Sequence, residues 1–225
     1  AKAIADVKQN PAVKIKQSSQ YLFILGLMVA TPTVYYGESI VVFLYGEAFS
    51  QAGLILGIFT LVGAFNAFKE PVNAYLLSID KQSMMLKLSA FTLVLSISLN
   101  TVLISHWGLK GAVIAYTAVS LILTIIMMFI AYYYLKITPN FKKLIIIAFS
   151  AVLAMYLAST VSDLLTGIFE ILVGFIVFGV LYLFCLIMLN ALNGSDYSIM
   201  VKYSTKLGQK PSKILQGFIS ARLKI

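Results

Sequence analysis

Six long apolar segments constrain the fold of this chain more than any other feature of its sequence. They cover residues 21–45, 53–77, 84–105, 109–135, 144–161 and 168–192, and short connectors with charged, glycine or proline residues separate them. A helix of roughly 20 apolar residues is long enough to cross the ~30 Å hydrocarbon core of a bilayer. The pattern therefore predicts an all-α integral membrane protein with about six transmembrane helices.

The composition agrees with this class and excludes several others. Hydrophobic residues make up 60% of the chain and charged residues only 11%, with a mean hydropathy of +0.95. Soluble domains are closer to half apolar and a quarter charged, so a water-soluble fold is excluded. The single cysteine, Cys185, leaves no partner for an intrachain disulfide or a paired-cysteine metal site.

The net charge of +9 follows the connectors rather than one surface. Lys and Arg residues lie before residue 21, around residues 69–87, at 136–143 and after residue 192, and Lys110 is the exception. Basic residues near helix ends stay in the cytoplasm, so we expect a multi-pass protein of the cell membrane with both termini cytoplasmic. Charge distributed in this way indicates membrane orientation and does not predict nucleic-acid binding.

Three regions follow from these patterns. Residues 1–20 form a cytoplasmic N-terminal segment, residues 21–192 the transmembrane domain, and residues 193–225 a basic amphipathic tail. The tail has the composition of a helix lying on an anionic leaflet, and a mobile basic segment is the alternative.

The second apolar segment contains an unusual set of polar residues. Asn66, Lys69, Glu70 and Asn73 share one face of a helix, and Pro71 predicts a kink beside them. Ionisable groups inside a bilayer are costly and usually face a wet cavity or a partner, so these residues are candidates for a substrate or ion pathway. The alternatives are that Lys69 reaches the cytoplasmic interface and that the asparagines bond between helices.

The first segment contains a second candidate. Pro32 predicts a kink there, and Glu38 lies near the non-cytoplasmic end, where it either joins the pathway or lies at the membrane interface. His106, the single histidine, is expected at an interface as well. No phosphate-binding loop, nucleophile–base pair or metal-ligand cluster is present in the sequence, so we expect no enzyme activity, no cofactor and no metal.

Small residues around the third connector predict close helix contact. Asn100, Gly108, Gly111, Ala112 and Ala115 are the candidates for helix packing. They lie in SLNTVLISHWGLKGAVIAYTAVS, which, with FLYGEAFSQAG and YLLSIDKQSMMLKLS, resembles the carboxy-terminal region of polysaccharide flippases of the multidrug/oligosaccharidyl-lipid/polysaccharide exporter superfamily. The sequence departs from the family pattern at Asp80, where glycine is common, and at His106, where proline is often found.

The resemblance implies the C-terminal part of a two-lobed, MATE-like transporter, with an N-terminal lobe missing from this chain. It implies a flippase that moves a lipid-linked oligosaccharide or polysaccharide precursor across the cytoplasmic membrane. In such a protein Lys69 would pair with a diphosphate, Asn66 and Asn73 would bind hydroxyls, and Glu70 would hold a proton or cation. The alternatives are a multidrug or small-solute antiporter of the same superfamily and a non-transporting membrane scaffold that binds glycan-synthesis enzymes.

Overall fold

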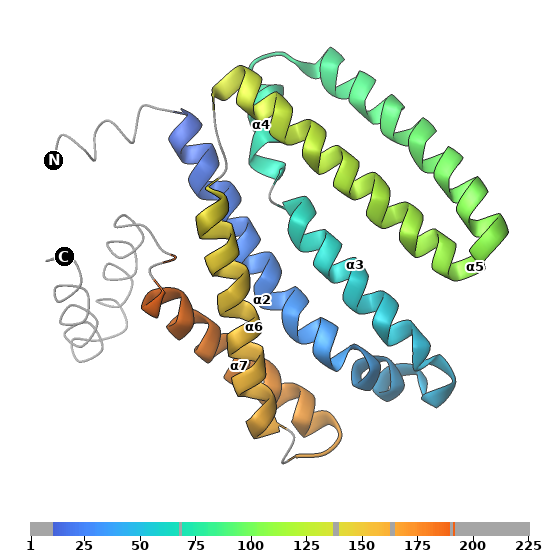
Figure 1. Cartoon of the computed structure of the whole chain (residues 1–225), viewed down its shortest axis with the longest axis vertical. Helices are drawn as coiled ribbons and strands as arrows, with labels where there is room; N and C mark the ends of the chain where they lie inside the picture. Colours follow the sequence, from blue (N-terminus) through green and yellow to red (C-terminus); the bar gives the residue numbers. More distant parts are fainter. Residues whose placement is uncertain (1–10, 68, 137–139, 163–164, 190, 192–225) are drawn as a thin grey trace, which may run out of the picture.

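The computed structural model describes residues 11–67, 69–136, 140–162, 165–189 and 191, and these residues form helices joined by short connections (Figure 1). The helices are α2 (Pro11–Tyr45), the short 3-10 helix η1 (Glu47–Phe49), α3 (Gln51–Ala67), α4 (Glu70–Ser78), α5 (Gln82–Leu135), α6 (Phe141–Ser162) and α7 (Ile168–Met188). The predicted all-helical class is confirmed for this part of the chain.

Five helical stretches in the described residues are long and apolar enough to cross a membrane, counting α3 and α4 as one stretch. The longest, α5, has 54 residues, which at 1.5 Å per residue exceeds twice the thickness of the hydrocarbon core. Its backbone leaves helical geometry at Gly108 (φ 54°, ψ −131°), and Figure 1 shows the chain turning back there. Helix α5 therefore consists of two antiparallel arms, residues 82–107 and 109–135, which match the third and fourth predicted segments.

Two details of α2 differ from the prediction. The helix begins at Pro11 rather than near Tyr21, because Ile15, Ser19 and Gln20 are buried against neighbouring helices and belong to the folded domain. The helix also continues through Pro32, where the sequence predicted a kink. The Thr33 hydroxyl donates a hydrogen bond to the Val29 carbonyl at 2.8 Å in the same turn.

The second predicted segment is broken rather than kinked. Helix α3 ends at Ala67 and α4 begins at Glu70, so Pro71 lies in the first turn of α4. Proline is well tolerated there because the first amides of a helix have no carbonyl partner within the helix. The prediction of a distortion near Pro71 is right, but its form is a helix end followed by a new helix start.

The helices run alternately up and down between two ends of the molecule. The start of α2, the α4–α5 connection and the start of α6 lie toward the upper left in Figure 1, and the α2–α3, α5 and α6–α7 turns lie toward the lower right. We call the first the lysine end, because described lysines gather there: Lys14, Lys16, Lys81, Lys136, Lys142 and Lys143.

At the lysine end, Asp80 adopts a left-handed backbone (φ 57°), a conformation that favours glycine and that Asp tolerates.

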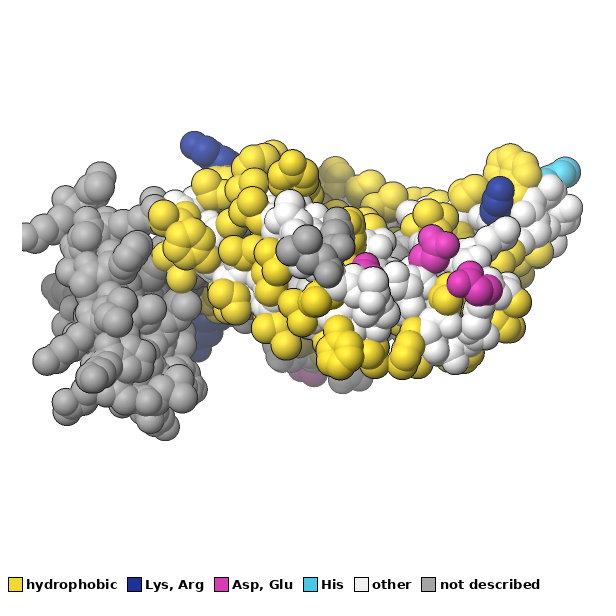
Figure 2. All heavy atoms as spheres, turned by 90° about the horizontal axis from the view of Figure 1, so that it is seen from below, with side chains coloured by type: hydrophobic (Ala, Val, Ile, Leu, Met, Phe, Trp, Pro, Cys, Tyr) yellow, Lys and Arg dark blue, Asp and Glu magenta, His cyan; other side chains and the backbone are white. Residues whose placement is uncertain are grey.

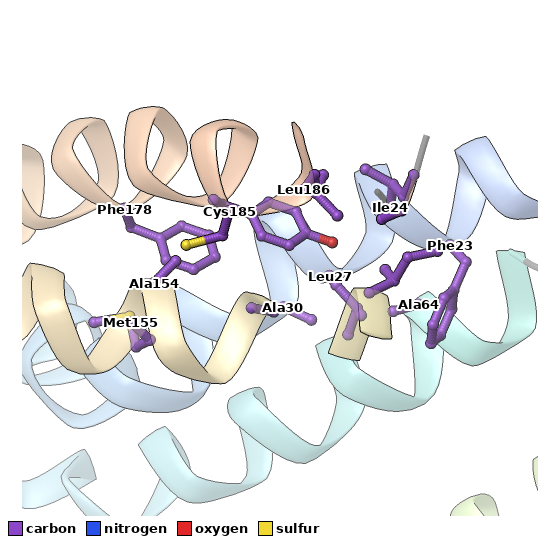
Figure 3. Close-up of a cluster of buried hydrophobic side chains, with 14 of the residues drawn as sticks. Phe23, Ile24, Leu27, Ala30, Ala64, Ala154, Met155, Phe178, Cys185 and Leu186 are labelled. Atoms are coloured by element: carbon purple, nitrogen blue, oxygen red, sulfur yellow. The ribbon is translucent and has the colours of Figure 1, made fainter. Parts of the chain in front are cut away.

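Hydrophobic side chains fill the interior and also cover much of the outside. The largest core cluster joins α2, α6 and α7, and Figure 3 shows Phe178 and Leu186 of α7 near Leu27 of α2 and Ala154 of α6. On the face drawn in Figure 2, hydrophobic side chains cover much of the described surface. A soluble protein rarely exposes so large an apolar surface, and a lipid environment accommodates it.

Glycines allow close contact between helices at several points. A Cβ on Gly26 would lie 2.7 Å from the Ala64 Cα, and one on Gly53 would lie 2.4 Å from the backbone of Glu38. At the α5 turn, a Cβ on Gly111 would overlap the Leu103 carbonyl, while one on Gly108 would meet nothing within 4 Å. Gly111 and the fully buried Ala115 therefore pack as predicted, whereas Gly108 makes the turn itself.

Some predictions fall outside the described residues. These are the structure of residues 1–10 and of the basic tail from residue 192 onward. The cytoplasmic orientation of the two termini also stays a prediction.

Candidate functional site

The break between α3 and α4 positions the most unusual polar group of the chain. Lys69 lies between the two helices, and its Nζ donates a hydrogen bond to Asn66 Oδ1 at 3.0 Å. The Asn66 amide in turn lies 3.4 Å from the hydroxyl of Ser120, on the second arm of α5. A half-buried lysine is thus held by a polar chain from the neighbouring helix.

The predicted polar stripe is divided between two sides of the chain. Glu70 is exposed, and its carboxylate accepts a hydrogen bond of 3.4 Å from Asn73. Glu70 lines an open groove with Lys14 and Tyr75, between the start of α2 and α4. Lys69 lines a different cavity, so the structure does not bring all four residues to one site. The reason is the helix break, which removes the continuous 100° rotation per residue on which the stripe depended.

Lys69 contributes to a small cavity that we call the lysine pocket. Its volume is about 40 Å³, and it lies among α2, α4, α5 and the start of α6. Three lysines line it, Lys16, Lys69 and Lys143, together with the polar residues Ser19, Gln20, Thr124 and Asn140 and the apolar residues Ile15, Val72, Met127, Met128, Ala131 and Leu144. The described residues that line the pocket include no Asp or Glu, so its charge is positive.

The start of α6 adds to this positive charge. Asn140 caps the helix, since its side-chain oxygen accepts a hydrogen bond of 3.2 Å from the Lys143 amide. The N-terminus of a helix carries a partial positive charge and favours anions. The pocket therefore has the electrostatic character of an anion site.

Two apolar cavities extend from the lysine pocket toward the opposite end of the molecule. The first has a volume of about 290 Å³ and shares Thr124, Met128 and Leu144 with the lysine pocket. The second, of about 680 Å³, shares Phe23, Phe65 and Ala148 with the first. We call these two cavities the apolar trough. Because neighbouring cavities share lining residues, the pocket and the trough lie next to one another.

Helices α2, α3 and α6 form the walls of the trough. It follows α2 from Phe23 to Tyr35 and α6 from Leu144 to Ser159. From Ser19 in the lysine pocket to Tyr35 at the far end, the distance along α2 is about 24 Å at 1.5 Å per residue. The three cavities together therefore extend along α2 over most of the thickness of the ~30 Å hydrocarbon core of a bilayer.

An aromatic pair lies where the two apolar cavities adjoin. The rings of Phe23 and Phe65 are tilted, with their centroids 5.4 Å apart, and both residues line both apolar cavities. Ala148 of α6 is the third residue common to the two cavities. These three residues therefore lie where the two cavities adjoin.

The other predicted site residues lie elsewhere. Glu38 is exposed near the end of α2, at the opposite end from Lys69, and belongs to no common site with it. Asn100 donates hydrogen bonds to the Ser96 carbonyl at 2.8 Å and to the Ser96 hydroxyl at 3.3 Å, all within the first arm of α5. Its polar group is therefore satisfied inside its own helix and does not bond to another. Ala112 is half-buried near the α5 turn.

Sequence reasoning missed several members of the lysine pocket. Lys16 and Lys143 were assigned only to the charge pattern of the connectors, and Ser120 and Gln20 were not noted. Gln20 is buried and donates a hydrogen bond of 2.8 Å to the Ala191 carbonyl, just after α7. The sequence shows that lysines lie near three helix ends. That they line one pocket depends on how the helices pack against each other.

Comparisons with known proteins assign no family to this chain. No protein family, curated protein or solved structure matches this chain.

Proposed function

We propose that this chain is part of a membrane transporter that moves lipid-linked saccharide precursors across the cytoplasmic membrane. The observation that carries the proposal is the half-buried Lys69, held by Asn66 next to a break in a membrane-length helical stretch. A cation kept at such a position is costly in lipid and is usually retained for an anionic ligand or a transport pathway. The resemblance to polysaccharide flippases supports the same function.

The lysine pocket and the adjoining apolar trough suit an amphiphilic substrate. A lipid-linked saccharide carries a negatively charged phosphate linkage and a long hydrocarbon chain. The lysine pocket offers cations at one end, and the apolar trough offers a hydrophobic wall along its length. A transporter for small hydrophilic solutes has no use for such a trough.

The proposal is tested in cells that depend on the complete gene product for a surface polysaccharide. Replacing Lys69 by Met should reduce export strongly, while replacing the exposed Lys142, two residues into α6, by Met should leave it unchanged. Surface polysaccharide and accumulated lipid-linked precursor are measured together, because a blocked flippase raises the second while lowering the first. Unchanged export in the Lys69→Met cells would contradict the proposal.

The same cells separate the alternatives. An antiporter for small solutes would protect cells from cationic dyes, and a scaffold for glycan-synthesis enzymes would lose precursor synthesis rather than export. Either pattern in the Lys69→Met cells would replace the flippase by that alternative.

A further inference from the structure

The positive charge of the lysine pocket is not balanced by its own walls. Lys16, Lys69 and Lys143 line this cavity of about 40 Å³, and the described residues around it include no Asp or Glu. We propose that the lysine pocket binds a small inorganic anion of the size of chloride, which links the start of α6 to the α3–α4 break. The inference does not depend on the proposed function, because it concerns an ion of the folded protein and not a transported substrate.

Three separate elements bring their ammonium groups to the pocket. Lys16 belongs to α2, Lys69 to the α3–α4 break and Lys143 to the first turn of α6, whose N-terminus adds partial positive charge. Like charges repel each other more strongly near the protein interior than in water. Asn66 accepts a hydrogen bond from the Lys69 Nζ but carries no negative charge, and Glu70 lines a separate open groove. An anion in the pocket therefore stabilises the folded protein.

Ser19 supplies a hydrogen-bond donor for this anion. Its side chain lines the pocket, the residue is only 3% exposed, and its hydroxyl has no hydrogen-bond partner among the residues that the structure describes. Buried hydroxyl groups are nearly always hydrogen-bonded, so an unpartnered one at the wall of a cavity indicates a bound group. The neighbouring Gln20 differs, because its amide donates a hydrogen bond to the Ala191 carbonyl. The Ser19 hydroxyl and the lysine ammonium groups can all donate, which suits an anion and not a cation.

The size and the lining of the pocket favour a halide over a larger oxyanion. A volume of about 40 Å³ has room for a few groups of the size of a water molecule, which matches a monatomic anion. Much of the lining is apolar, with Val72, Met127 and Ala131 among its members. A strongly hydrated anion such as sulfate loses more hydration free energy on entering such a pocket than chloride does. The expected order of affinity is therefore bromide and chloride above sulfate.

The bound anion would link two parts of the bundle that make few direct contacts. Helix α6 packs mainly against α2 and α7, whereas α4 packs against α2 and α5. Lys143 at the start of α6 and Lys69 before α4 nevertheless line the same cavity. An anion between them attracts both ammonium groups, so its binding should hold the start of α6 in place.

The test uses the full chain in nanodiscs of phosphatidylcholine, with radiolabelled chloride as the probe and sodium gluconate to keep the ionic strength constant. We expect saturable chloride binding, and replacing gluconate by chloride should raise the midpoint of thermal unfolding by a few degrees. Bromide should compete with the labelled chloride better than sulfate does. The absence of saturable binding would show that only water fills the pocket, and tighter binding of sulfate would show an oxyanion site. Either outcome overturns the proposal.

A lipid head group is the other possible source of negative charge. Chloride binding should therefore be the same in nanodiscs that also contain phosphatidylglycerol. Loss of chloride binding in these nanodiscs would show that an anionic lipid occupies the pocket, and it would overturn the assignment to an inorganic anion.

Variants locate the bound anion. Lys16→Gln and Ser19→Ala each remove one donor from the pocket and should raise the dissociation constant of chloride about fivefold. Lys142→Gln and Ser18→Ala are the matched controls, because both residues are exposed, neighbour pocket residues in the sequence and do not line the pocket. Equal affinity in the four variants would place the chloride elsewhere and overturn the assignment.

Hydrogen exchange tests the link to α6. In chloride, the backbone amides around residues 144–150 should exchange more slowly than in gluconate, and Ser19→Ala should reduce this difference while Ser18→Ala leaves it unchanged. Chloride binding without any change in the exchange of α6 would show that the anion does not link α6 to the α3–α4 break.

Discussion

The Nζ of Lys69 lies 3.0 Å from the side-chain oxygen of Asn66, and this hydrogen bond links the end of α3 to the break that precedes α4. The two residues are three positions apart, yet the bond does not lie within a continuous helix. This hydrogen bond holds the ammonium group of Lys69 at the break between α3 and α4. The position of this cation therefore depends on the break, which Pro71 follows in the first turn of α4.

Replacing Pro71 by Ala should extend helical hydrogen bonding across the break. Proline has no amide hydrogen and clashes with the carbonyl four residues earlier, so its removal lets α3 and α4 join. We expect slower hydrogen exchange of the backbone amides around residues 69–73, measured by mass spectrometry in detergent. Pro32→Ala is the control, because α2 is already helical through Pro32 and should gain less protection. Equal changes in both variants would contradict this explanation of the break.

Joining the two helices should also move Lys69. A continuous helix would place the lysine at a new angle relative to Ser120, and the polar chain through Asn66 would be lost. Export of surface polysaccharide should therefore fall in cells with the Pro71→Ala protein, even though no side chain that lines the lysine pocket has changed. Retention of full export would show that the break does not position the lysine.

Replacing Gly111 by Ala should destabilise the turn between the two arms of α5. A Cβ there overlaps the Leu103 carbonyl, so the backbones must separate, at a cost of about 1–3 kcal/mol. Gly63→Ala is the control, since a Cβ at Gly63 meets nothing within 4 Å and alanine is the better helix former by up to about 1 kcal/mol. Unfolding free energies in mixed micelles should change in opposite directions, and a stabilised Gly111→Ala protein would contradict the contact.

Two buried tyrosines should respond oppositely to loss of the hydroxyl. The Tyr36 hydroxyl is hydrogen-bonded to the Ser162 hydroxyl at 2.5 Å, so Tyr36→Phe should lower the unfolding free energy by about 1 kcal/mol. The Tyr182 hydroxyl is buried against Phe178 without a hydrogen-bond partner, so Tyr182→Phe should be neutral or stabilising. A larger loss in Tyr182→Phe than in Tyr36→Phe would show that the hydroxyl of Tyr182 has a bound water or ligand.

If the hydrocarbon chain of the proposed lipid-linked substrate lies in the trough, Ala148 and Phe65 should control how far it reaches. A phenylalanine at position 148 would face Phe23 and Phe65 and close the boundary between the two apolar cavities. We expect geranylgeranyl phosphate to bind more tightly than geranyl phosphate in the original protein, and Ala148→Phe to remove most of this difference. Phe65→Ala should preserve or enlarge the difference in affinity between the two phosphates.

The control for the boundary is a phenylalanine on the outside of the same helix. Phe149 is 57% exposed, against 41% for Phe65, and it does not line either cavity. Phe149→Ala should leave the dependence on chain length unchanged. A chain-length dependence that is the same in all these proteins would exclude passage of the chain between Phe23 and Ala148.

The sequence by itself determined the membrane-spanning, all-helical class and the number of apolar segments, because burial in hydrocarbon requires long uninterrupted runs of apolar residues. It also placed a connector between residues 105 and 109, a distortion at Pro71 and a close contact at Gly111, since glycine and proline act on the backbone locally; that Gly108 makes the turn instead of packing came from the structure. These features need no knowledge of which helix lies beside which.

Only the tertiary structure decided which polar residues share a site. Along the sequence Asn66, Lys69, Glu70 and Asn73 belong together, but the break between α3 and α4 directs Lys69 to one cavity and Glu70 to another. Lys16 and Lys143 are 127 positions apart and meet in one pocket because α2 and α6 start at the same end of the bundle. Convergence of this kind is set by helix contacts between distant segments, and single-sequence periodicity carries no information about those contacts.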